Sequence, residues 1–219
     1  MPAILLTTAV VALVAYCYLS LIGLAAGWFI LPRRWLPYWP LVTPLLGWVV
    51  LDAVAHPLNI VLPLRPVLWA IGCVAVVVVV GIAARDGRKM MSVARRPGPW
   101  RESLVPLTLG LGVYASGMWA HVRQGALSHV IFDSDAERYA EVIASMLSFP
   151  IGWRLALVVN FADTPQGPPY GHMHALVSAL TGLDVFTAAM PSHMLMLSLA
   201  PSGVFLFCRT VLKVAWRGA

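Results

Sequence analysis

Charge is scarce in this sequence. Only 11% of its 219 residues are Asp, Glu, Lys or Arg, whereas 60% are hydrophobic. Soluble domains carry roughly 25% charge, so the composition excludes a soluble globular protein and predicts an integral membrane protein. The net charge of +6 does not predict nucleic-acid binding, because the basic residues cluster in short loops between apolar runs, as membrane topology requires.

Cysteine is also rare. The three cysteines, Cys17, Cys73 and Cys208, lie far apart inside apolar segments. Their spacing excludes a secreted disulfide framework and a cysteine-based metal site. We interpret them as small buried hydrophobic residues.

Long apolar runs dominate what is present. A helix needs about 20 apolar residues to cross a bilayer, and five stretches qualify, at about residues 3–31, 41–63, 66–84, 104–122 and 185–212. The first lacks the basic start and cleavage site of a signal peptide, which predicts a permanent span. The sequence therefore predicts an all-α, polytopic transmembrane helical bundle of about five spans.

Basic residues predict the orientation of these spans. Arg33 with Arg34, the stretch 85–102, and Lys213 with Arg217 are expected on the cytoplasmic side. The N-terminus and region 123–171 then lie outside. Three segments follow from this topology: four spans with cytoplasmic basic loops at 1–122, an extracytoplasmic acidic loop with juxtamembrane helices at 123–183, and a fifth span with its cytoplasmic end at 184–219.

Four of the nine acidic residues lie close together in HVIFDSDAERYAEVIASM, at 129–146 in the outer region. Ser134 and Glu137 fit a capping box, and Ala136, Tyr139, Ala140, Ile143 and Leu147 recur at helical spacing and form one face. This pattern predicts an amphipathic helix on the outer membrane surface. Asp133 and Asp135 at its start have two interpretations: they cap the helix, or they perform chemistry.

The next stretch, NFADTPQGPPYGHMHALVSALTGLDVFTAAM at 160–190, places a proline-rich turn before a short helix. We expect that helix to carry His172 and His174 and to stop at Gly182, where the last span follows. Two histidines that are two positions apart face different ways on a helix, so we do not expect them to share one metal ion.

Over about residues 129–213 the chain resembles the GT-C superfamily of polytopic membrane glycosyltransferases. The shared pattern is an acidic motif with a tyrosine, a proline-tyrosine turn, a short helix ending in glycine, and a span with basic residues at its end, here FLFCRTVLK. The resemblance implies transfer of a sugar from a polyprenyl-phosphate donor to an extracytoplasmic acceptor of the cell envelope, in a bacterial plasma membrane. Members usually have several hundred residues and more spans, so we expect this chain to be the N-terminal part, with a second membrane chain as a possible supplier of the other spans.

The resemblance also implies roles for individual residues. Asp135, four residues before Tyr139, best matches the catalytic acid position and would act as a base, with Asp133 as the second choice. Both carboxylates are candidate ligands for a divalent cation, Mg²⁺ or Mn²⁺. The expected substrate-binding residues are Glu137, Arg138, Tyr139, Tyr170, His172 and His174. Apart from the resemblance, the basic residues Arg123, Arg138 and Arg154 of the outer region are candidates for binding the lipid-linked phosphate, although for each one singly we favour a solvated or headgroup-bound arginine.

A second polar cluster lies within the second apolar run. Asp52, His56 and Asn59 are spaced at i, i+4 and i+7, so they share one helix face. They form either a packing cluster, with Asp52 bonded to His56, or part of a proton or ion pathway; we favour packing. For the whole chain, the alternative to an enzyme is a non-catalytic membrane subunit that binds a lipid-linked glycan or serves as a scaffold.

The predicted topology can be tested with single cysteines at Ser92 and Ser134 in a cysteine-free variant. Ser92 lies in the basic stretch and Ser134 in the acidic one, so an impermeant thiol reagent should label them from opposite sides of the membrane. Labelling of both positions from the same side would refute the topology.

Overall fold

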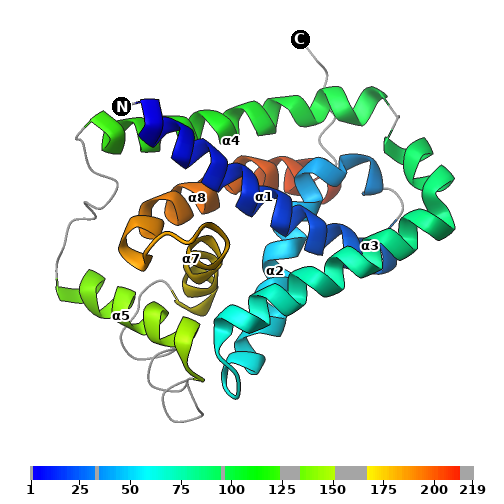
Figure 1. Cartoon of the computed structure of the whole chain (residues 1–219). Helices are drawn as coiled ribbons and strands as arrows, with labels where there is room; N and C mark the ends of the chain where they lie inside the picture. Colours follow the sequence, from blue (N-terminus) through cyan, green and yellow to red (C-terminus); the bar gives the residue numbers. More distant parts are fainter. Residues whose placement is uncertain (1, 33–34, 95–96, 124–133, 151–166, 213–219) are drawn as a thin grey trace.

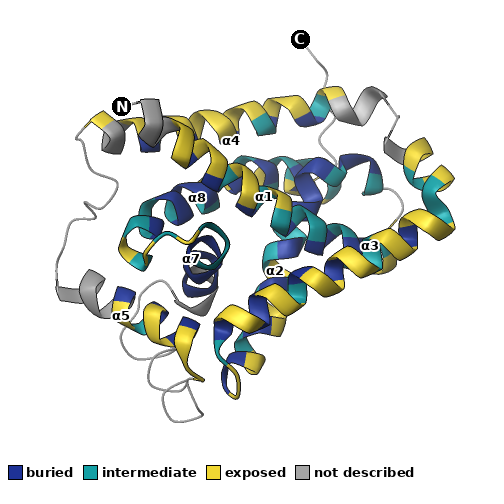
Figure 2. Ribbon diagram, viewed as in Figure 1, coloured by how far each residue is buried: buried dark blue, intermediate teal, exposed yellow. Residues whose placement is uncertain are grey.

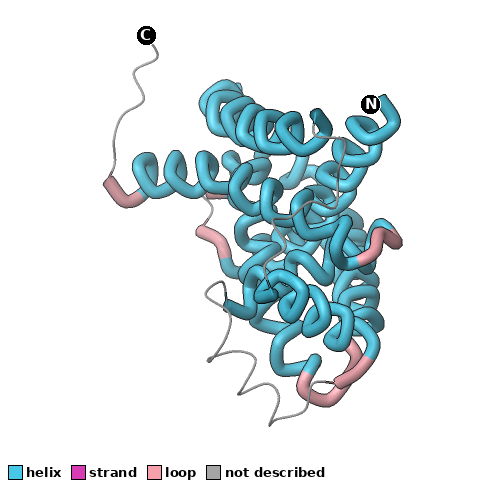
Figure 3. Tube along the Cα trace, turned by 90° about the vertical axis from the view of Figure 1, so that its left-hand side faces the viewer, coloured by secondary structure: helices cyan, strands magenta, loops and turns pink. Residues whose placement is uncertain are grey.

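The computed structural model describes residues 2–32, 35–94, 97–123, 134–150 and 167–212 (Figure 1). Within these ranges every regular element is a helix and no strand occurs (Figure 3), which confirms the predicted all-α fold. The elements are α1 (Pro2–Ile30), η1 (Leu36–Tyr38), α2 (Trp39–Asn59), α3 (Leu64–Ala94), α4 (Pro97–Arg123), α5 (Ser134–Ser148), α7 (Gly167–Thr181) and α8 (Val185–Thr210).

Four segments in the described part of the chain are long and apolar enough to cross a membrane: Leu6–Ile30, Leu36–Asn59, Leu64–Ser92 and Val185–Thr210. The chain is therefore a membrane protein, as its composition predicts. α4 covers the fourth predicted run as a continuous helix of 27 residues, although it is not one of these four segments.

The junction between α7 and α8 matches the prediction closely. α7 ends at Thr181, and Gly182 adopts φ 72°, a left-handed conformation that glycine tolerates without strain. Asp184 then caps α8, because its carboxylate accepts a hydrogen bond of 2.9 Å from the backbone N–H of Thr187. The hydroxyl of Thr187 also donates to this carboxylate, at 2.5 Å, and the side-chain and backbone hydrogen bonds of Thr187 together lower the pKa of the Asp184 carboxyl group.

The basic stretch after the third predicted span is not the loop that we expected. α3 continues through it to Ala94, with a kink at Asp86, whose φ of −122° and ψ of 17° are not helical. Lys89 donates a 2.9 Å hydrogen bond to Asp86. Arg, Lys, Met and Ala are strong helix formers, so the exposed helix tolerates the charges that suggested a loop.

Glycines let the helix backbones approach closely. A Cβ built on Gly23 of α1 would lie 1.8 Å from the carbonyl oxygen of Thr43, and one on Gly47 of α2 would lie 1.8 Å from that of Leu19. Only glycine fits at this crossing, which is how transmembrane helices usually pack. Gly110 of α4 meets the Ser198 carbonyl of α8 in the same way, at 2.3 Å.

Tyrosine hydroxyl groups connect the helices by donating to backbone carbonyls of their neighbours. Tyr16 of α1 donates to Pro40 at 2.5 Å, and Tyr18 of α1 donates to Leu68 of α3. Tyr114 of α4 donates to Thr8 of α1 at 2.8 Å. Each bond satisfies a polar group that would otherwise be unpaired among apolar side chains.

An ion pair joins the chain segments at the Arg209 end of α8. Arg209 Nη2 donates to Glu102 of α4 at 3.2 Å, and its Nε donates to the hydroxyl of Tyr38 at 3.3 Å. Tyr38 in turn donates to Glu102 at 2.8 Å. The network fixes η1, α4 and α8 to one another.

α7 is the most enclosed helix (Figure 2). Residues 171–178 are all buried, since α1, α2, α3, α5 and α8 all pack against α7. By contrast, α3 exposes a valine-rich face, with Val77 at 71%, which is compatible with contact with lipid.

The α1–α2 crossing gives a stability prediction. Gly47→Ala places a methyl group 1.8 Å from the Leu19 carbonyl oxygen, so the two helices must separate. We expect the free energy of unfolding to fall by about 1–3 kcal/mol, measured by reversible unfolding in detergent. Gly81→Ala is the control, because its Cβ would meet nothing within 4 Å and alanine has the higher helix propensity. Equal losses in both variants would contradict the close crossing.

Candidate functional site

The predicted amphipathic helix is present as α5, Ser134–Ser148. Its apolar face is buried at Ala140, Ile143, Met146 and Leu147, whereas Glu141 is exposed. Three of these buried positions lie on the predicted face, and Met146 was not foreseen. The face packs on α3, α7 and α8, so its apolar side chains are buried against protein; the expected position at the outer membrane surface stays a prediction.

The predicted catalytic residues lie at the start of α5. Asp133 is outside the described residues. α5 begins at Ser134, and its first turns contain Asp135, Glu137, Arg138 and Tyr139; the cap stays a prediction. Their side chains, and that of Tyr170 on α7, are outside the described part of the structure, as is Arg154. Arg123 is exposed at the end of α4. The roles assigned to these residues remain predictions.

His172 and His174 are described, and they face different ways as predicted. His172 Nδ1 donates to the carboxylate of Asp52 on α2, whereas His174 Nε2 donates to the backbone carbonyl of Val185 on α8. Both side chains are buried, so they hold helices together and do not line an open substrate pocket. Burial lowers the pKa of His174 to about 4, despite its hydrogen bond to Val185.

We expected Asp52 to form its hydrogen bond with His56, but the structure shows that bond with a residue of another helix. Its partner is His172, which lies 120 positions away in the sequence. The rings of His56 and His172 pack edge to face, with centroids 5.6 Å apart. A carboxylate inside a membrane span requires a partner, and α7 supplies one from outside α2.

Asn59 continues the same face of α2. It is fully buried, and its side-chain amide donates to the backbone carbonyls of Leu62, at 3.0 Å, and Met146 of α5, at 3.1 Å. The polar face predicted from the sequence thus exists. Its three members bind α7 and α5, which the sequence could not show.

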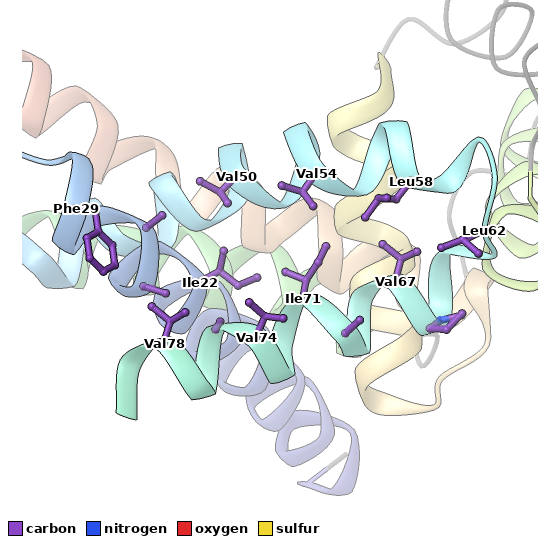
Figure 4. A pocket seen from close by; sticks show the side chains of 15 residues that line it. Ile22, Phe29, Val50, Val54, Leu58, Leu62, Val67, Ile71, Val74 and Val78 are labelled. Atoms are coloured by element: carbon purple, nitrogen blue, oxygen red, sulfur yellow. The ribbon is translucent and has the colours of Figure 1, made fainter. Parts of the chain in front are cut away.

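The opposite face of α2 lines a groove shared with α1 and α3, of about 630 Å³ (Figure 4). Val50, Val54 and Leu58 line it from α2, and Ile71 and Val74 line it from α3. One end lies at Leu62 in the turn between α2 and α3. The signal in the sequence was the apolar spacing at 50, 54 and 58, which ordinary helix packing also explains.

The described residues were also considered as ligands for a metal ion. Among the described residues, no group of three or more His, Cys, Asp or Glu side chains could hold a metal ion. The predicted ligands Asp133 and Asp135 fall outside the described side chains.

Comparison with known proteins does not assign the chain to a family. No family model, curated protein or solved structure matches it.

The burial of His174 predicts a dependence of stability on pH. Its pKa is about 4 in the folded protein and about 6.5 in an unfolded chain, so between these values only the unfolded chain takes up the proton. The contribution of His174 to stability should therefore be fully present above about pH 6.5 and be lost as the pH falls toward 4, by up to about 3 kcal/mol. Unfolding measured in detergent at neutral and acidic pH should show this loss.

His174→Gln is the matched variant, because glutamine can still donate to the Val185 carbonyl but does not titrate. Its stability should decrease less on acidification than that of the wild type. An identical decrease in both proteins would exclude His174 as the cause.

Proposed function

We propose that the chain is a membrane glycosyltransferase, or its N-terminal part, which moves a sugar from a polyprenyl-phosphate donor to an extracytoplasmic acceptor of the cell envelope. The membrane would be a bacterial plasma membrane, with region 123–171 on the outer side. The observation that carries the proposal is the arrangement at one end of the bundle. Asn59, the last residue of α2, lies next to the turn where the aliphatic groove ends, and it donates to the carbonyl of Met146 in the last turn of the acid-bearing helix α5.

The groove supports a lipid-linked donor. All fifteen lining residues are apolar, and they belong to helices that contain candidate spans or to the turn between them. A hydrocarbon chain in such a groove gains close packing along its length. An isoprenoid chain lying between Val50 and Leu62 would bring its phosphate toward the end of α2 that Asn59 bonds to α5.

The start of α5 supports the chemistry. A hydroxyl group that attacks the sugar needs a base, and a carboxylate within hydrogen-bond reach can accept its proton. The N-terminus of α5 favours a negatively charged carboxylate at Asp135. Asp135 would thus be the base and Asp133 its partner, while Glu137, Arg138 and Tyr139 would shape the site.

The phosphate leaving group carries charge that must be neutralised. Carboxylate oxygens are the donors that hard divalent cations prefer, so Asp133 and Asp135 would hold Mg²⁺ or Mn²⁺. When bound, such an ion would stabilise the developing charge on the phosphate. An arginine of the outer region could bind the same phosphate through paired N–H groups.

One observation favours a second candidate, a non-catalytic subunit that binds a lipid-linked glycan or scaffolds a larger membrane complex. His172 and His174 were expected in a substrate pocket, but both are buried and bonded to neighbouring helices. A lipid-binding groove without catalysis would account for the same apolar surface.

Asp135→Asn distinguishes the two candidates. Asparagine can still cap a helix but cannot accept the proton, so sugar transfer from a labelled polyprenyl-phosphate donor in native membranes should fall by about 10²- to 10⁴-fold. Glu141→Gln is the control, because Glu141 is an exposed acid on the same helix, and it should leave the rate unchanged. Wild-type transfer by Asp135→Asn would favour the non-catalytic subunit.

A further inference from the structure

The contact between Asp52 and His172 joins two helices that lie far apart in the sequence. Asp52 is on α2, within the candidate span Leu36–Asn59, and His172 is on α7. The His172 side chain is completely buried, whereas 26% of the Asp52 side chain is exposed. The histidine side of this contact is therefore enclosed by protein, whereas the aspartate side is partly accessible.

The charge of this pair depends on one proton. A carboxylate beside a neutral imidazole has a net charge of −1, which is unfavourable inside a membrane-spanning bundle. One additional proton makes the pair neutral overall, as an imidazolium and a carboxylate or as a neutral imidazole and a carboxylic acid. His172 Nε2 is buried and has no hydrogen-bond partner among the described residues, so that nitrogen is open to the proton.

We propose that Asp52 and His172 form a proton-binding site within the bundle, and that the bound proton keeps α7 docked on α2. Without the proton, the pair is negative and the docking of α7 is weakened. We do not place a metal ion at this pair, because among the described residues no group of three or more His, Cys, Asp or Glu side chains could hold one. The proposal does not depend on glycosyl transfer.

His56 limits the site to a single proton. Its ring lies against that of His172, at 5.6 Å between centroids. Two imidazolium rings at this separation repel each other, whereas one imidazolium beside one carboxylate is balanced. The cluster therefore takes up one proton and not two.

The helices that pack against α7 carry other titratable groups, several of which are exposed or hydrogen-bonded to other residues. Arg65 and Glu141 are exposed, and Asp184 caps its own helix. His193 on α8 is partly buried and has contacts of its own, so it must be controlled for. The remaining groups in the described part of these helices are Tyr16, Cys17, Tyr18, Cys73, Arg85, Asp86, Arg88, Lys89, His174, Cys208 and Arg209.

The first test measures the proton directly in the wild-type protein. Ring ¹⁵N spectra of the histidine-labelled protein in lipid bilayers, assigned with His172→Gln and His193→Gln, report the protonation of His172. Infrared spectra with labelled aspartate report Asp52. At neutral pH we expect either a doubly protonated His172 or a protonated Asp52. A singly protonated His172 beside an ionised Asp52 would overturn the proposal without any variant.

The second test asks whether the proton controls docking. Amide hydrogen exchange over 167–181, corrected for the intrinsic effect of pH, should become faster in the wild type at alkaline pH. Asp52→Asn keeps an acceptor for His172 but removes the negative charge, so this increase should disappear. The doubly protonated form of His172, where the wild type shows it, should also decrease strongly in this variant.

His174→Gln serves as the control for exchange, since His174 is buried on the same helix but bonded to Val185. It should retain the increase at alkaline pH. The docking part of the proposal is wrong if Asp52→Asn shows the same increase as the wild type.

Discussion

Every polar group inside a bilayer-spanning bundle must find its partner within the protein, because hydrocarbon offers none. This requirement determines much of the tertiary structure. Asn59 donates to the Met146 carbonyl and so binds α5 to α2, while Asp52 binds α7 through His172. Tyrosine hydroxyls bind α1 to its neighbours. Apolar packing alone specifies the relative position of two helices only weakly. These few hydrogen bonds fix which turn of one helix contacts which turn of its neighbour.

The close crossing of α1 and α2 also depends on a few specific contacts. At Gly23 and Gly47 the backbones meet without an intervening side chain, so dispersion contacts are dense where no hydrophobic effect operates between helices in lipid. Gly47 is spaced at i, i+3, i+7 and i+11 with Val50, Val54 and Leu58, so the crossing and the groove lie on the same side of α2. The opposite side carries the polar residues that hold α7 and α5.

The sequence predicted the helices well because their signals are local. The end of α7 at Gly182 and the start of α8 at Val185 follow from glycine and from the Asp184 cap. The apolar face of α5 follows from periodicity. The basic stretch misled us, because charge suggested a loop where helix propensity prevails. The partner of Asp52 could not be predicted, because a residue 120 positions away competes with His56 and only the packing of α7 decides between them.

The carboxylates at the start of α5 and the carboxylate of Asp52 meet opposite physical demands. Those at the start of α5 stand at a helix N-terminus, where the helix dipole favours the ionised form without a buried counter-ion. Asp52 stands within a span, where ionisation requires a cation, and its neighbour His172 becomes one only by taking up a proton. A carboxylate at the first position can accept a proton from a substrate repeatedly. At the second position, proton transfer changes the charge that holds two helices together, so its consequence is conformational and not chemical.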